Sequence, residues 1–72
     1  MDLIDYEEEA RLGREEAADR LRQIADQLSR HNQIAFDDKG LKTTVPVPDE
    51  VTMSVEVEVG DDGSEIEIEI SW

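Results

Sequence analysis

The sequence predicts an α+β domain in which a single helix packs on a four- to five-stranded, mainly antiparallel sheet, in the order β-α-β-β-β-β. Two patterns carry this prediction. Apolar side chains recur at helical spacing between residues 13 and 31, and apolar and polar side chains alternate with period two from residue 34 onward. Short stretches rich in glycine and aspartate separate the alternating segments. Since no linker or repeat interrupts the chain, residues 1–72 are expected to form one domain.

The predicted helix begins after Gly13 and ends near His31 and Asn32. Gly13 takes the N-cap position, and Glu16 follows three residues later, where its carboxylate reaches back to the cap amide. The apolar stripe consists of Ala17, Leu21, Ile24, Ala25 and Leu28. Opposite charges four residues apart add about 0.2–0.5 kcal/mol per pair, and the pairs in question are Glu16/Arg20, Arg22/Asp26 and Asp26/Arg30.

Strands are predicted on both sides of the helix. Residues 3–12 alternate loosely and form a first strand, although Glu8 interrupts its apolar side. Ile34 and Phe36 lead into a turn over residues 37–40, which ends in Gly40, where a left-handed residue is needed. The return strand runs from residue 41 to 47. Two prolines, Pro46 and Pro48, place it at a sheet edge or end it.

The pattern of the last two strands predicts their register. With a loop over residues 60–63, one mainly apolar face receives the pairs Val59/Ser64, Val57/Ile66, Val55/Ile68, Met53/Ile70 and Val51/Trp72. A slip of one residue would break this agreement. The other face pairs Glu58 with Glu65 and Glu56 with Glu67, with Glu69 beyond. Like charges directly opposite one another destabilise a ladder, so we expect this face to need screening ions.

Charge and composition exclude several function classes. The formal net charge is −13, and the chain contains no cysteine and a single histidine, His31. Disulfides, thiol catalysis and a two-histidine metal site within one chain are therefore excluded. The negative charge opposes direct binding to nucleic acid or to an anionic membrane. It also opposes folding in dilute buffer, whereas molar salt shortens the Debye length to about 3 Å. We therefore favour an acidic, halophilic protein over a disordered chain.

Hydropathy gives no indication of a membrane segment. No apolar run approaches the roughly 18 residues of a membrane span, and residues 1–5 lack the features of a signal peptide. The expected location is the cytoplasm.

Four features together point to a known family. They are a strand with tyrosine and glutamates, the Arg-Glu-Glu-Ala-Ala start of the helix (residues 14–18), the Val-Pro-Val-Pro segment (residues 45–48), and the amphipathic last strand that ends in Trp72. From Ile4 to Trp72 the chain resembles the amphi-Trp domain, a small domain of salt-loving archaea. Gly13 departs from the serine usual at the helix cap. The resemblance implies the fold and a high-salt environment, and it implies no activity, catalytic residue or cofactor.

Residues that could carry catalysis are few. His31, near the helix end, is better explained as a last-turn histidine that interacts with the negative helix end than as a general base. The serines lack a histidine–carboxylate system to activate them. We therefore expect no catalytic residue and no cofactor, and we do not expect an enzyme.

Two surfaces remain as candidates for binding. Oxygen ligands suit hard cations, so the acidic sheet face is a candidate cation or small-ligand site, although a solvated face explains it more simply. Its residues are Glu56, Glu58, Glu65, Glu67 and Glu69. Trp72 either closes the edge of the core beside Val51 or anchors an interface. All five arginines lie between residues 11 and 30, where they either pair within the helix or attract an acidic partner such as another copy's sheet face.

We conclude that the sequence predicts a non-enzymatic protein–protein interaction module that forms a homodimer. A core of 72 residues leaves apolar surface and strand edges that association would bury. The alternative is a cation or small-ligand binder that uses the acidic face. Neither nucleic acid nor a membrane is an expected partner.

Overall fold

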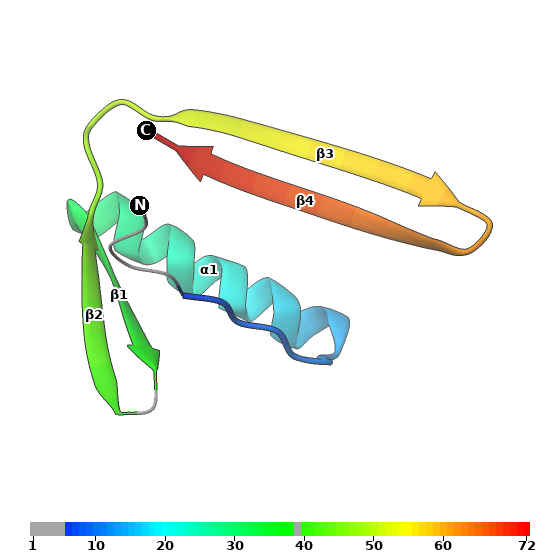
Figure 1. Ribbon diagram of the computed structural model, residues 1–72, viewed down its shortest axis with the longest axis horizontal. Helices are drawn as coiled ribbons and strands as arrows, with labels where there is room; N and C mark the ends of the chain where they lie inside the picture. The colour runs from blue at the N-terminus through cyan, green and yellow to red at the C-terminus, as the bar shows by residue number, and fades with distance from the viewer. Residues whose placement is uncertain (1–5, 39) are drawn as a thin grey trace.

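The computed structural model describes residues 6–38 and 40–72 and contains one helix and two β-hairpins (Figure 1). Both strand pairs are antiparallel, and each pair forms its own two-stranded sheet. The elements are α1 (Arg14–Arg30), β1 (Gln33–Asp38), β2 (Leu41–Pro46), β3 (Thr52–Gly60) and β4 (Gly63–Ser71). The α+β class and the single helix are confirmed.

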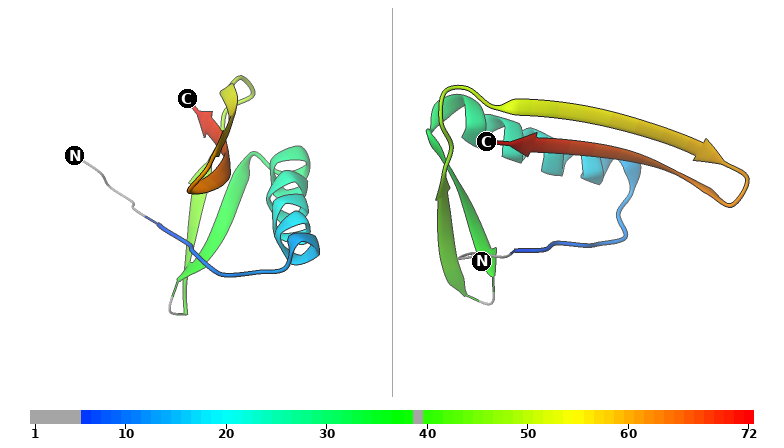
Figure 2. Two further views of the ribbon diagram at one scale, coloured as in Figure 1. Left: turned by 90° about the vertical axis from the view of Figure 1, so that its right-hand side faces the viewer. Right: turned by 45° about the horizontal axis from the view of Figure 1, so that its top comes forward.

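The four strands do not join into the continuous sheet that we expected. Among the described residues, no Cα atom of β3 or β4 lies within 8 Å of a Cα atom in α1, β1 or β2. The left view of Figure 2 shows the second hairpin standing apart from the helix. Pro46 and Pro48 border the connection between the hairpins. Because proline has no backbone N–H, Pro46 and Pro48 offer no donor to a further strand at this end of β2.

The predicted first strand is also absent from the part that the structure describes. Residues 6–12 form no strand, and residues 3–5 of that prediction lie outside the described residues. A strand beside β1 would need the outward backbone groups of β1. One of these, the amide of Ala35, instead donates to Oε1 of Gln27 on α1 at 2.7 Å. The helix therefore occupies the edge that the expected strand would have used.

The helix begins and ends where its sequence predicts. Gly13 is the N-cap, and its N–H donates to Oε1 of Glu16 at 3.4 Å. His31 is the C-cap, and its N–H donates to the carbonyl of Gln27 at 2.9 Å. The three expected i,i+4 ion pairs do not form among the described residues. The ion pairs there are Arg22–Asp19, at i,i+3, and Arg20–Glu8, both at 2.8 Å.

Arg20 fastens the segment before the helix to the helix itself. Its Nε and Nη2 donate to the two carboxylate oxygens of Glu8, each at 2.8 Å, a bidentate geometry that strengthens the pair. These bonds lower the pKa of Glu8 and raise the pKa of Arg20. The Tyr6 hydroxyl also donates to Glu8, at 3.2 Å, and the Tyr6 ring lies 4.7 Å from the ring of Phe36 on β1.

Both turns are shorter than predicted, and the register of the second hairpin follows the sequence. The first turn was expected over residues 37–40, but Asp37 and Asp38 belong to β1, where they pair with Lys42 and Leu41. Gly40 has a φ of +82°, in the left-handed region that we expected there. In the second hairpin Gly60 pairs with Gly63, so the turn proper is Asp61–Asp62, and the predicted pairing of β3 with β4 is confirmed from Val59/Ser64 to Met53/Ile70. The last pair in the ladder is Thr52/Ser71.

The core of the single chain is very small. Among the described residues only Ile34 and Val47 are buried apolar side chains, each 9% exposed. Val47 follows β2, and its N–H donates to the carbonyl of Asn32 at 2.7 Å, which anchors the chain before the second hairpin. Of the four described strands, β1 is the one with Cα atoms within 8 Å of the helix. Most apolar side chains of the chain therefore remain in contact with solvent.

The Gln27 bond to β1 predicts a measurable contribution to stability. Gln27→Ala should lower the free energy of unfolding by about 1–2 kcal/mol, because it leaves the part-buried amide of Ala35 without its acceptor. Gln23→Ala is the matched control. Gln23 is exposed, and it accepts only a 3.4 Å bond from Arg20. Urea unfolding in molar KCl measures both, and equal losses would contradict the assignment.

The Arg20–Glu8 pair predicts a pH dependence. A carboxylate whose pKa is lower in the folded state than in the unfolded chain stabilises the folded state at pH values above its unfolded pKa, here 4.5. This contribution to stability is lost as the pH falls through the folded pKa. Arg20→Gln should therefore lie below the wild type in stability near pH 6 and approach it as pH falls below 4.5. Arg22→Gln removes an exposed pair and should follow the wild-type profile. Thermal unfolding between pH 3 and pH 6 tests both, and parallel profiles for wild type and Arg20→Gln would refute the linkage.

Candidate functional site

The β3–β4 hairpin has two faces of opposite chemistry, because successive side chains of a strand point to opposite sides. One face receives the cross-strand pairs Met53/Ile70, Val55/Ile68 and Val57/Ile66. We call this surface, with the residues that extend it at both ends, the apolar face. Its members are Val51, Met53, Val55, Val57, Val59, Ile66, Ile68, Ile70 and Trp72.

The apolar face is open to solvent, and its exposure grows toward the turn. From Val51, just before β3, to Val59 the exposed fraction rises from 42% to 79%, and along β4 it rises from half-buried Ile70 to 70% at Ile66. Figure 1 shows the hairpin carrying its turn well away from β1 and β2. Contiguous apolar patches of this kind are uncommon on the surface of monomeric proteins.

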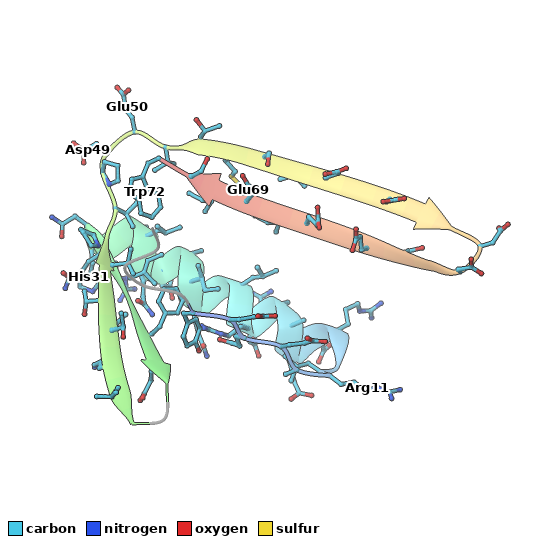
Figure 3. The ribbon with its side chains drawn as sticks, in the orientation of Figure 1. Arg11, His31, Asp49, Glu50, Glu69 and Trp72 are labelled. Atoms are coloured by element: carbon cyan, nitrogen blue, oxygen red, sulfur yellow. The ribbon has the colours of Figure 1, made fainter. Side chains whose placement is uncertain are left out.

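Trp72 lies at the base of this hairpin. It follows the last ladder pair, beside the connection that carries Asp49 (Figure 3), and its side chain is 61% exposed. We had expected Trp72 to close the edge of the core against Val51, which is itself 42% exposed. In the single chain it closes no core. Its second predicted role, as an interface anchor at the base of the apolar face, stays a prediction.

The acidic face of the hairpin carries glutamates in directly opposed pairs. Glu56 lies opposite Glu67, and Glu58 lies opposite Glu65, while Glu69 lies opposite Ser54. Within residues 6–38 and 40–72, no group of three or more acidic or histidine side chains converges in a way that could hold a metal ion. The carboxylates form two rows along an open ladder, where each pair repels. The proposed cation role of these five residues is not tested by this arrangement.

The helix presents a second free surface that the sequence did not identify. We had assigned Leu21 to a stripe that packs on the sheet, but Leu21 is 50% exposed, and Ala17 and Ala25 on the same side are exposed too. The half-buried members of that stripe are Ile24 and Leu28. Spacing alone shows that a helix has an apolar side, and it does not show how much of that side the same chain will cover.

The arginines and the histidine of the helix lie where their positions predict. Arg11, Arg14 and Arg30 are exposed and form no ion pair with any described residue. His31 is exposed at the end of α1, where its backbone caps the helix. Figure 3 shows Arg11 and His31 at opposite ends of the helix, so these two side chains do not converge on one site.

Comparison with known proteins identifies a family over nearly the whole chain. The family model of the Amphi-Trp domain matches residues 2–72. Neither a curated protein nor a solved structure matches the chain. Of the helices in the described part, none is long and apolar enough to cross a membrane.

The opposed glutamates predict a stability that depends on salt. Glu56→Gln/Glu67→Gln should raise the free energy of unfolding by about 0.2–1 kcal/mol at low ionic strength, because one repulsive cross-strand pair is removed. The gain should shrink in molar KCl, where screening already weakens the repulsion. Circular dichroism melting at the two salt concentrations measures this difference.

The control for this salt effect is Glu15→Gln/Glu16→Gln, which removes the same charge from the first turn of α1. Acidic side chains stabilise that end of a helix, so the control should lower stability at low salt. A gain of equal size in both variants would show that net charge, rather than the ladder pairing, sets the response.

Proposed function

This chain belongs to the Amphi-Trp domain family, and we propose that it is a non-enzymatic protein–protein interaction module that associates with a second copy of itself. The observation that carries the proposal is the uncovered apolar face of the β3–β4 hairpin. A hairpin of two strands has no second layer of its own, so it needs a partner to shield one face from water.

The accessible surface of the chain supports association. A compact protein of 8.2 kDa exposes about 4,500 Å², whereas this chain exposes 6,899 Å². The excess is about 2,400 Å² per chain, which lies within the range of obligate dimers, since these bury about 1,000–2,500 Å² on each partner. The radius of gyration agrees, at 14.1 Å against about 11 Å for a compact domain of this length.

The small core supports the same proposal. Domains of this size bury only about 60% of their unfolded surface even when they are compact. They commonly gain stability from disulfides, a structural metal or oligomerisation. This chain has no cysteine, and its described residues bury two apolar side chains. Of these three sources of stability, association is the one that the exposed apolar surface of this chain favours.

We infer a salt-rich cytoplasm as the setting of this association. The net charge of −13 makes two copies repel one another at long range. At molar ionic strength this repulsion acts over only about 3 Å, and the burial of apolar surface then dominates. Direct contact with nucleic acid or anionic lipid is opposed by the same charge.

The alternative function is a cation or small-ligand binder that uses the acidic face. The opposed pairs Glu56/Glu67 and Glu58/Glu65 favour it, because two carboxylates at one rung attract counterions. A saturable calorimetric signal for Ca²⁺ or Mg²⁺ above the KCl background, lost in Glu56→Gln/Glu67→Gln, would support this alternative over simple screening.

Self-association predicts a sensitivity that is confined to the apolar face. Wild-type protein should sediment as a dimer at micromolar concentration in molar KCl. Val57→Ser/Ile66→Ser removes one cross-strand apolar pair from each copy, and it should weaken the dimer at least about 100-fold, because about 3 kcal/mol or more of burial is lost. Both side chains are exposed in the single chain, so the substitutions leave its buried core at Ile34 and Val47 unchanged.

The matched control is Glu58→Gln/Glu65→Gln, the adjacent pair on the opposite face. It should leave the dimer intact or strengthen it slightly. A wild-type protein that sediments as a clean monomer across the micromolar range would refute self-association. Equal weakening by the control pair would mean that the acidic face, rather than the apolar face, forms the contact.

A further inference from the structure

We propose that in the dimer the apolar face of each β3–β4 hairpin lies on helix α1 of the other copy, with the Asp61–Asp62 turn next to Arg14. This inference rests on the proposed self-association and names the surface that receives the hairpin. The two contacts are reciprocal, so a single two-fold axis relates them and the assembly closes at two copies.

The receiving surface is the uncovered side of the helix. Ala17, Leu21 and Ala25 recur every four residues and are all exposed, and Leu12, two residues before the helix begins, is exposed as well. We call these four residues the free helix stripe. The helix packs on β1 by another part of its surface, where Ile24 and Leu28 are half-buried. One side of α1 therefore packs on β1, and the free helix stripe on the other side remains exposed to solvent.

The two surfaces match in length and width. At 1.5 Å per residue, the 17 residues of α1 span about 25 Å. At about 3.4 Å per residue, the nine residues of β3 and of β4 span about 30 Å. Two strands about 5 Å apart are also about as wide as a helix. A hairpin laid along α1 would cover the free helix stripe from end to end.

Charge favours a hairpin-on-helix contact and sets its direction. Residues 51–72 contain seven acidic residues and no lysine or arginine, whereas residues 11–30 contain five arginines and four acidic residues. Arg11 and Arg14 stand at the N-terminal end of α1 without an ion pair to any described residue. This end also carries the positive helix dipole. The acidic Asp61–Asp62 turn is therefore best placed there.

Two other arrangements are less favourable. If two hairpins stacked on one another by their apolar faces, both free helix stripes would remain in water. If a hairpin folded onto its own helix, the connection after Val47 would have to bend. Val47 is buried and bonded to Asn32, and Pro48 follows it directly. In the single chain the hairpin and α1 stay apart.

Cross-linking between differently labelled copies tests the proposed contact. The chain contains no cysteine, so an introduced cysteine is the only thiol in each single variant and every cross-link must involve it. Leu21→Cys and Val57→Cys proteins are mixed in molar KCl and treated with a short bismaleimide. We expect covalent dimers that contain one chain of each variant, because Leu21 and Val57 lie on the two surfaces that meet. The control mixes Leu21→Cys with Glu58→Cys, which carries the thiol on the opposite face of the same hairpin, and it should give several-fold less product.

Each other outcome overturns the proposal in a distinguishable way. If Val57→Cys protein alone cross-links to itself more than the mixture does, the hairpins stack on one another and the helix is not the receiving surface. If the double variant Leu21→Cys/Val57→Cys cross-links within a monomer, the hairpin closes on its own helix. If the same samples sediment as monomers, the proposed self-association itself fails, whatever the cross-linking pattern.

Discussion

The structure depends on one constraint: a hairpin whose side chains alternate strictly must place all of its apolar groups on one side, and two strands cannot cover that side themselves. From Met53 to Ile70 the ladder keeps this sorting without a slip. The helix and the first hairpin enclose only a small core at Ile34 and Val47. The large accessible surface of the chain follows directly, because its longest strands contribute almost nothing to that core.

The same alternation also sets the electrostatic character of the protein. Sorting the valines and isoleucines to one side forces the glutamates to the other, where Glu56 meets Glu67 and Glu58 meets Glu65. Like charges directly opposite one another at successive rungs destabilise a ladder, and dissolved salt screens this repulsion. The exposed apolar surface and the self-repelling acidic surface are therefore two sides of one hairpin.

Local features were predictable because their causes lie close together in the chain. The bounds of the helix follow from Gly13, Glu16 and His31, and the turn at Gly40 follows from a backbone angle that glycine adopts without strain. The prediction of a single sheet failed for a different reason. β1 can pair with another strand only where its outward backbone amides are free. The side chain of Gln27, on α1, already accepts the hydrogen bond from the amide of Ala35. No pattern in the sequence indicates such a bond.

By itself the sequence determined the helix, the antiparallel pairing, the register of β3 with β4 and the chemistry of each face, since period and turn residues act within a few positions of one another. Only the tertiary structure decided that the strands form two separate sheets, that residues 6–12 are held by Arg20 instead of pairing as a strand, and that Leu21 and the apolar face stay uncovered. The physical reason is that periodicity sets which side of an element is apolar, whereas the cover of that side depends on contacts between elements far apart in the chain.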